Sequence, residues 1–225
     1  MRKLNAFTLA AITLFLTSCG GKSSGDSKTT EEQQVAEKQG ESYTVDLQAS
    51  KVDWKAFHKG GFAPRWGTLS ITSGEVSVNN GELTAGDFVI DMQSLKVDPQ
   101  SVTEKDKKYS DLEAHLKSAD FFDVTKNPTA DFKITSVTNL ATPAENAVAG
   151  ANKTISGNLT LKGKALNVTF PAKVTTADGV VSIEAKFTVN RSDWDIKFGT
   201  SEANPAEWMI SKDIEIGVDV KTAKK

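Results

Sequence analysis

The sequence is poor in the residues that most often carry catalysis or hold metals. Its 225 residues include one cysteine and two histidines. They contain no Gly-rich phosphate loop, no GxSxG nucleophile elbow and no HExxH zinc motif. A lone thiol cannot form a disulfide within the chain, and two histidines far apart in sequence are a thin basis for a metal site. We therefore expect no catalytic residue, no metal site and no cofactor.

An excess of either charge is also lacking. The chain has 27 basic and 29 acidic side chains and a formal net charge of -2 at pH 7. This balance is unlike that of nucleic-acid-binding domains, which carry clustered basic charge. With 38% hydrophobic residues, the chain is long enough for one sizeable core. We expect one folded domain preceded by extra segments.

Long apolar runs are absent except near the N-terminus. Arg2 and Lys3 precede an apolar stretch, 6–16, which small residues and Cys19 follow. This layout is typical of a secretory signal peptide, and the stretch is too short for a membrane-spanning helix. The residues LTSC resemble the lipobox of bacterial lipoproteins, whose cysteine is modified with diacylglycerol and becomes the first residue of the mature chain. An ordinary signal peptide with a chance cysteine is the alternative.

The position of the only cysteine favours lipidation, so we expect a lipoprotein signal peptide at 1–18 and a lipidated Cys19. Residues 19–41 are rich in Gly, Ser, Thr, Lys, Glu and Gln. Because such a segment buries little apolar surface, we expect a flexible tether of about 25 Å. The chain would be anchored to a membrane of the bacterial cell envelope, on the periplasmic side of the outer membrane or at the cell surface.

Residues 42–225 show the period-2 alternation of antiparallel strands. In KVDWKAF, for example, Val52, Trp54 and Ala56 share one face, and charged residues occupy the other. About eight to ten such segments must bury a shared apolar face, which a closed antiparallel barrel and a two-sheet sandwich both do. The length of two segments, 86–95 and 180–189, favours the barrel. The expected fold class is all-β with one short helix.

The segment SDLEAHLKSADFFD, 110–123, departs from this alternation. Ser110, followed three residues later by Glu113, predicts a helix N-terminus with a capping box. Phe121 and Phe122 follow the expected helix, which we predict to be a helical cap at one end of the barrel. Apolar residues recur at helical spacing along it: Tyr109, Leu112, Leu116 and Ala119.

His115 lies beside this apolar stripe. Asp111 is four residues earlier, on the same helix face, so Asp111, His115 and His58 are one candidate metal group. The more ordinary interpretation is that His115 forms a hydrogen bond close to the helix and that His58 lies in a surface loop. We favour the ordinary interpretation because no third nitrogen or thiolate ligand is available.

Four segments carry a resemblance to a known family: YTVDLQASKVDWKAFH, HLKSADFFDVTKNPTADFKITSV, ISGNLTLKGKALNVTFPAKV and FTVNRSDWDI. In this order and spacing they resemble the YceI-like family of bacterial periplasmic proteins, over about residues 43–220. The run from His115 to Phe132 is the most specific part. The resemblance implies an extended, lipocalin-like antiparallel β-barrel of about eight strands, with a helix near one end.

The resemblance also implies a function. Such barrels enclose a long apolar channel that holds a polyisoprenoid, an isoprenoid quinone or a similar amphiphile, and no catalytic activity is generally attributed to the family. We therefore expect non-catalytic binding, storage or transport of such a lipid, with its headgroup at the mouth near His58, Arg65 or His115. The candidate ligand-binding residues are Trp54, Phe57, His58, Phe88, Ile90, Met92, His115, Leu116, Phe121, Phe122, Phe132, Ile134, Leu159, Leu161, Ile183 and Phe187.

Two other functions stay open from the sequence. One is an enzyme acting on a lipid headgroup, with His115 as general acid or base. The other is a structural envelope lipoprotein whose barrel is filled by side chains. The family contains dimers, so a homodimer is a further expectation. The chain departs from the usual family pattern at Trp66 and in a longer loop at 140–154, which bears on the identity of the ligand rather than on the fold.

Overall fold

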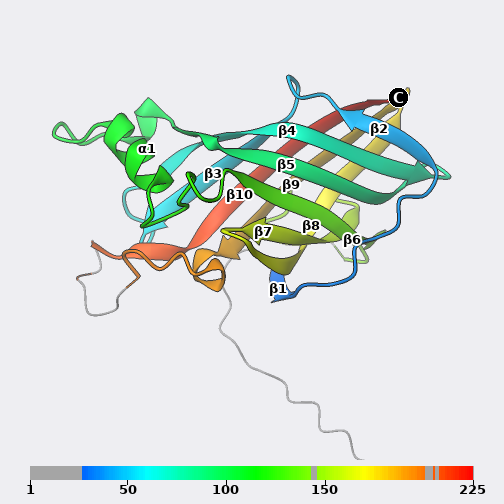
Figure 1. Cartoon of the computed structure of the whole chain (residues 1–225). Helices are drawn as coiled ribbons and strands as arrows, with labels where there is room; N and C mark the ends of the chain where they lie inside the picture. The colour runs from blue at the N-terminus through cyan, green and yellow to red at the C-terminus, as the bar shows by residue number, and fades with distance from the viewer. Residues whose placement is uncertain (1–26, 143–145, 201–204, 206–207, 225) are drawn as a thin grey trace, which may run out of the picture.

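The computed structural model describes residues 27–142, 146–200, 205 and 208–224. The predicted signal peptide and the predicted lipidation site, Cys19, lie outside the described residues. The described part contains ten strands and three helices (Figure 1). The strands are β1 (Lys28–Glu31), β2 (Glu41–Val45), β3 (Lys51–His58), β4 (Arg65–Asn79), β5 (Glu82–Val97), β6 (Thr129–Asn139), β7 (Lys153–Leu161), β8 (Lys164–Ala177), β9 (Val180–Asn190) and β10 (Ile210–Lys224). The helices are α1 (Tyr109–Lys117) and two short 3-10 helices, η1 (Pro99–Ser101) and η2 (Arg191–Trp194).

Eight of these strands close a barrel. Each of β3 to β9 pairs with the next strand along the chain, and β10 returns to pair with β3. Every pair is antiparallel. The predicted all-β antiparallel barrel with one α-helix is therefore confirmed, and the two-sheet sandwich is excluded because the ring of strands closes on itself.

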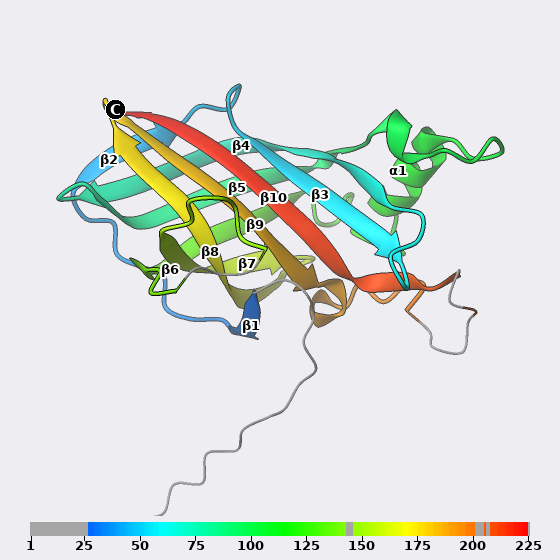
Figure 2. The same ribbon diagram turned by 180° about the vertical axis from the view of Figure 1, so that it is seen from behind.

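The two ends of the barrel differ. α1 lies at one end, and the C-terminus lies at the other (Figures 1 and 2). At the C-terminal end, β2 pairs with β4 and with the last residues of β10, beyond the residues that β3 reaches. Tyr43, Val76, Val78 and Leu83 belong to the buried core near this end, and none of them is more than 4% exposed. Packed side chains therefore fill the barrel here.

The structure corrects the predicted tether over its second half. β1 pairs with residues 166–169 of β8, along an edge that β9 leaves free because β9 pairs only with residues 172–177. Asn158 Nδ2 donates a hydrogen bond to the Gln33 carbonyl at 2.6 Å, and Asn158 Oδ1 accepts one from the Gln33 amide at 3.0 Å. Main-chain hydrogen bonds can order such a polar segment without apolar burial. The flexible-tether prediction is therefore wrong for residues 28–36, where β1 pairs with β8 and where Gln33 and Ala36 form hydrogen bonds with the barrel.

The helix forms where the sequence predicts it, but without the predicted capping box. The N-cap residue is Lys108, whose side chain makes no capping hydrogen bond, and Ser110 lies inside the first turn. Glu113 instead accepts a hydrogen bond from the Val97 amide at 3.2 Å and one from Lys117 Nζ at 3.0 Å, which ties α1 to the end of β5. No helix among the described residues has the length and apolar character that crossing a bilayer requires.

Candidate apolar ligand site

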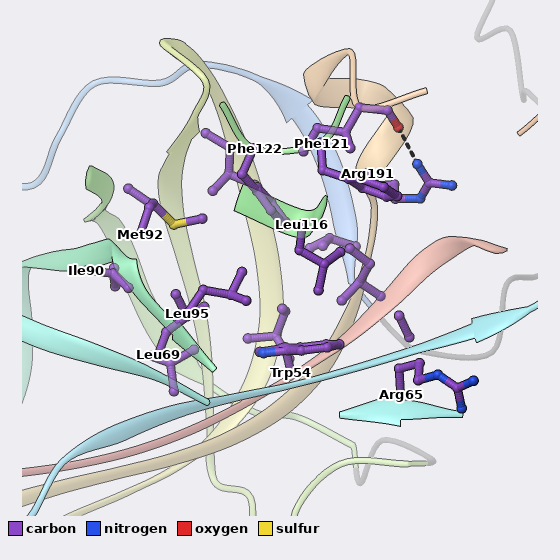
Figure 3. A pocket seen from close by; sticks show the side chains of 18 of the residues that line it. Trp54, Arg65, Leu69, Ile90, Met92, Leu95, Leu116, Phe121, Phe122 and Arg191 are labelled. Carbon is purple, nitrogen blue, oxygen red and sulfur yellow. Dashed lines mark hydrogen bonds between the residues drawn. The ribbon is translucent and has the colours of Figure 1, made fainter. Parts of the chain in front are cut away.

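The barrel is hollow toward α1. A cavity of about 510 Å³ extends from the middle of the barrel to the end that carries the helix. Apolar side chains make up most of its wall, and Figure 3 shows Leu116, Phe121 and Phe122 among the side chains that line it together with the strand residues Trp54 and Ile90. A filled interior, which the sequence left open, is therefore found only toward the C-terminal end.

All sixteen residues predicted to bind the ligand border this cavity. Ten project from the inner faces of strands β3, β5, β6, β7 and β9, and the others lie at the end of β3, on α1 or just after it. Their contact with a ligand stays a prediction. They are Trp54, Phe57, His58, Phe88, Ile90, Met92, His115, Leu116, Phe121, Phe122, Phe132, Ile134, Leu159, Leu161, Ile183 and Phe187.

Phenylalanine rings form a continuous part of the wall. The centroids of Phe88 and Phe132 lie 6.4 Å apart, those of Phe132 and Phe170 lie 5.7 Å apart, and Phe170 stacks on Phe187 at 4.0 Å. Gly157 leaves room for one of these rings, because a Cβ atom at that position would come within 2.3 Å of Phe132 Cζ. Glycine is therefore required sterically where the Phe132 ring crosses β7.

Arg65 holds the loop 102–108 at the mouth. Its Nη1 donates a hydrogen bond to the Ser101 carbonyl at 2.7 Å, and its Nη2 lies 2.5 Å from Glu104 Oε1. The pKa of Glu104 falls to about 2, first because its own main-chain amide donates to the carboxylate, with Arg65 and Lys107 adding to the effect and burial opposing it. The Ser101 carbonyl and the Glu104 carboxylate both accept hydrogen bonds from Arg65. Arg65 therefore joins the start of β4 to the loop 102–108 and orders the mouth of the cavity.

Arg191 is a buried cation on the cavity wall and is only 2% exposed. Its guanidinium donates hydrogen bonds to main-chain carbonyls of Ile196 at 2.8 Å, Phe198 at 2.8 Å, Ile210 at 3.2 Å and Ser211 at 2.9 Å. Burial lowers the pKa of Arg191 to about 10, so the side chain remains charged at neutral pH. Arg191 thereby joins the connection after β9 to the start of β10.

His115 lies beside the mouth in an aromatic setting. Its Nε2 is 3.0 Å from Asp120 Oδ2, and its ring meets the rings of Phe121 and Phe198 edge-on, at 5.1 Å and 4.8 Å. The candidate metal group with Asp111 and His58 does not form. Among the described residues, no three His, Cys, Asp or Glu side chains are placed to hold a metal ion.

The sequence did not point to several residues of this site. Arg191 follows a strand in the motif NRSDW and looks like an ordinary loop charge, and Phe198 lies in a segment without periodicity. Phe170, by contrast, was detectable, because Leu166, Val168 and Phe170 alternate with polar residues in the segment LNVTF, a pattern that predicts a strand. Arg191 and Phe198 both belong to the connection between β9 and β10, where no periodic pattern marks a residue.

Comparison with known proteins places this barrel in a family. The model of the YceI-like domain matches residues 43–222. The UPF0312 proteins of Pseudomonas aeruginosa and Pseudomonas paraeruginosa are 36% identical to the chain over 93 residues, which are 40% of this chain and 44% of each relative. The match thus spans less than half the length of these curated relatives.

Solved structures share the fold at low sequence identity. BcnA from Burkholderia cenocepacia superposes with a TM-score of 0.56 and 20% identity, over 79% of this chain and 98% of that one. A polyisoprenoid binding domain from Saccharophagus degradans superposes with a TM-score of 0.53 and 11% identity, over 85% of this chain and all (100%) of that one. With its barrel, its helix at one end and a domain model that matches most of its length, the chain belongs to the YceI-like family.

Proposed function

We propose that this protein binds an amphiphilic isoprenoid-type lipid, such as a polyisoprenoid or an isoprenoid quinone, in the barrel cavity and stores or carries it without chemical change. The observation that carries the proposal is the apolar cavity of about 510 Å³, whose lining includes the polar side chains of His58, Arg65 and His115. An apolar tail fits the wall, and a polar headgroup fits the mouth. The printed description of the Saccharophagus degradans domain as polyisoprenoid binding supports the same ligand class.

The apolar wall provides the affinity. Each methylene equivalent transferred from water to such a wall contributes about 0.8 kcal/mol, so a tail that buries about ten of them gains about 8 kcal/mol before ordering costs. The phenylalanines adapt to a methyl-branched chain through ring contacts that need no directional bonds. Affinity should therefore depend on tail length more than on the headgroup.

The mouth provides polar partners for a headgroup. His58 lies at the end of β3, and His115 lies on α1 across the opening, so both border the cavity where it meets solvent. Their ring nitrogens can donate to a carbonyl, hydroxyl or phosphate oxygen. We assign these two side chains to headgroup contact, because both line the cavity and carry ring nitrogens beside its apolar wall.

We also propose that Cys19 anchors the protein to a membrane of the cell envelope. The motif LTSC after an apolar leader supports this anchor. Several acyl chains on one cysteine exceed the hydrophobicity needed for stable attachment. Metabolic labelling with a radioactive fatty acid, compared between the wild type and Cys19→Ala, tests this part independently of the cavity, and an unlabelled wild type would exclude it.

Solvent extraction of the purified full chain, followed by mass spectrometry, tests the ligand. Ala130 is 3% exposed and borders the cavity, so Ala130→Phe should fill part of it. Ala114 lies on the exposed face of α1, so Ala114→Phe is the matched control. We expect an isoprenoid lipid in extracts of the wild type and of Ala114→Phe, and much less in extracts of Ala130→Phe.

Thermal unfolding of the two variants shows whether each remains folded. An extract of the wild type without any isoprenoid lipid would contradict the proposed ligand. An equal amount of lipid in a folded Ala130→Phe variant would show that the ligand does not occupy the barrel cavity.

A further inference from the structure

Three large aromatic side chains are exposed around the mouth of the cavity. Phe62 is 63% exposed, Trp208 is 73% exposed and Phe198 is 43% exposed. Aromatic side chains of this size are usually buried, so a group of them at one place on the surface indicates a binding surface. We call these three side chains the aromatic rim.

Main-chain hydrogen bonds bring the three loops of the rim together. The His58 amide donates to the Phe62 carbonyl at 2.8 Å, and the next amide, that of Lys59, donates to Met209, the neighbour of Trp208, at 2.7 Å. The amide of Ile210 donates to the carbonyl of Gly199, the neighbour of Phe198, at 2.9 Å. The end of β3, the start of β10 and α1 accordingly share one end of the barrel in Figure 2.

The cavity opens among these loops. Its wall continues from the buried interior to the exposed residues Asp106 and Lys108 of the loop before α1, and to Ala63 of the β3–β4 connection. Phe198 contacts the His115 ring at this opening. The aromatic rim therefore lies beside the opening of the cavity, on the β3–β4 and β9–β10 connections.

Two loops of the mouth carry net positive charge, although the whole chain has a net charge of -2. Residues 59–65 and 102–108 contain five basic and two acidic side chains. The basic ones are Lys59, Arg65, Lys105, Lys107 and Lys108, and the acidic ones are Glu104 and Asp106. A basic surface that also exposes tryptophan and phenylalanine matches the interface of an anionic bilayer, where aromatic rings lie among the headgroups and lysines approach phosphates.

We propose that the aromatic rim and the basic loops dock on the surface of an anionic lipid bilayer, with the mouth of the cavity facing the membrane. This proposal rests on the proposed lipid ligand. In this orientation an isoprenoid tail passes between bilayer and barrel without crossing water. Exposure of its full apolar surface to water would otherwise impose a large barrier to each transfer.

Fluorescence quenching by brominated lipid tests the docking. The full chain is mixed with vesicles of phosphatidylcholine and phosphatidylglycerol in which bromine is attached to the acyl chains. The chain has four tryptophans, and all of them contribute to the fluorescence emission. The contribution of Trp208 is the difference in emission between the wild type and Trp208→Phe. Trp66 lines a groove on the outer surface of the wall, with Lys96 and Glu113, and not the cavity, so Trp66→Phe is the matched control.

We expect bromine to quench the share of emission that belongs to Trp208 and to leave the share that belongs to Trp66. The rim variant Phe62→Ser/Trp208→Ser should slow transfer of a fluorescent isoprenoid analogue from vesicles by about tenfold or more, as expected when two interfacial aromatic side chains are lost. Its equilibrium retention of the same analogue in detergent solution should match that of the wild type.

Two results would overturn the docking proposal. One is emission of Trp208 that brominated vesicles leave unchanged. The other is a dimer in sedimentation velocity that the rim variant dissociates, since a second copy would then cover the rim. Quenching of Trp208 by vesicles together with an extract that contains no lipid would refute the proposed ligand but retain the docking. An extract that contains the lipid, together with Trp208 emission that the vesicles do not quench, would support the proposed ligand and refute the docking.

Discussion

Replacement of Arg191 by methionine should destabilise the fold more than any other single loss at the mouth. The guanidinium is 2% exposed and donates to four main-chain carbonyls of residues 196, 198, 210 and 211. Through these hydrogen bonds, Arg191 of η2 holds the following loop, at residues 196 and 198, and the start of β10, at residues 210 and 211. Methionine occupies a similar length of side chain but offers no donor, so all four carbonyls lose a partner.

The size of the effect follows from the number and the kind of these hydrogen bonds. Each hydrogen bond from a charged donor contributes about 1.5 to 3 kcal/mol. The gross loss is partly offset, because removal of the charge also removes its desolvation cost, which is the cause that lowers the Arg191 pKa to about 10. Carbonyls of the surface loop can also regain water. We therefore expect a net loss of about 3 to 5 kcal/mol in the free energy of unfolding.

Urea unfolding followed by tryptophan fluorescence measures this loss at neutral pH. Arg191→Lys is the matched control, because an ammonium keeps the charge but cannot reach four carbonyls in a plane. The lysine variant should fall between the wild type and the methionine variant. A methionine variant within about 1 kcal/mol of the wild type, the usual range for surface changes, would show that the four hydrogen bonds do not hold the mouth together.

Three other changes test separate parts of the structure. Gly157→Ala should destabilise the barrel by about 1 to 3 kcal/mol in urea unfolding, because its methyl group displaces the Phe132 ring, and Phe132→Leu should restore part of the loss if the clash is the cause. Asn158→Ala should speed amide hydrogen exchange in residues 28–36, because Gln33 loses two hydrogen bonds, and unchanged exchange would contradict the role of Asn158. The folded-state pKa of Glu104 is depressed from 4.5 to about 2, so its contribution to stability is present above pH 4.5 and is lost as pH falls from 4.5 toward 2. Glu104→Gln should therefore be less stable than the wild type at pH 7 and should lose less stability across that acid window, and parallel pH profiles of the two proteins would show that Glu104 makes no such contribution.

The wall of the cavity could be predicted because strand alternation is a local signal. Once a residue such as Phe88 is assigned to the inner face, its partners two positions away point the same way. The closed barrel then brings these inner faces together, and residues as distant in sequence as Trp54 and Phe187 line one cavity. The prediction needed no knowledge of pairing order, since any antiparallel closure directs the same faces inward.

β1 could not be predicted by the same reasoning. The residues KTTE contain no apolar side chain, so neither periodicity nor burial marks them as a strand. They are ordered by the free edge of β8 and by Asn158, and both exist only after the barrel has formed. Pairing with the free edge of β8 therefore makes a strand of a segment whose composition is typical of a linker. The predicted N-cap at Ser110 was wrong for a similar reason. The helix begins after Lys108 because its first residue depends on the path of the loop after β5, which local sequence does not determine.

The division between a predictable wall and an unpredictable mouth has a functional consequence. Residues of the wall belong to strands whose hydrogen-bonded register fixes them, so a change at Phe132 or Ile183 alters the space for the tail. Residues of the mouth belong to connections held by single side chains such as Arg65 and Arg191, which tolerate different loop sequences as long as these anchors remain. Family members with the same barrel should therefore agree in the apolar character of the bound tail. Under the proposed function, they should differ in headgroup preference and membrane contact, which we assign to the loops.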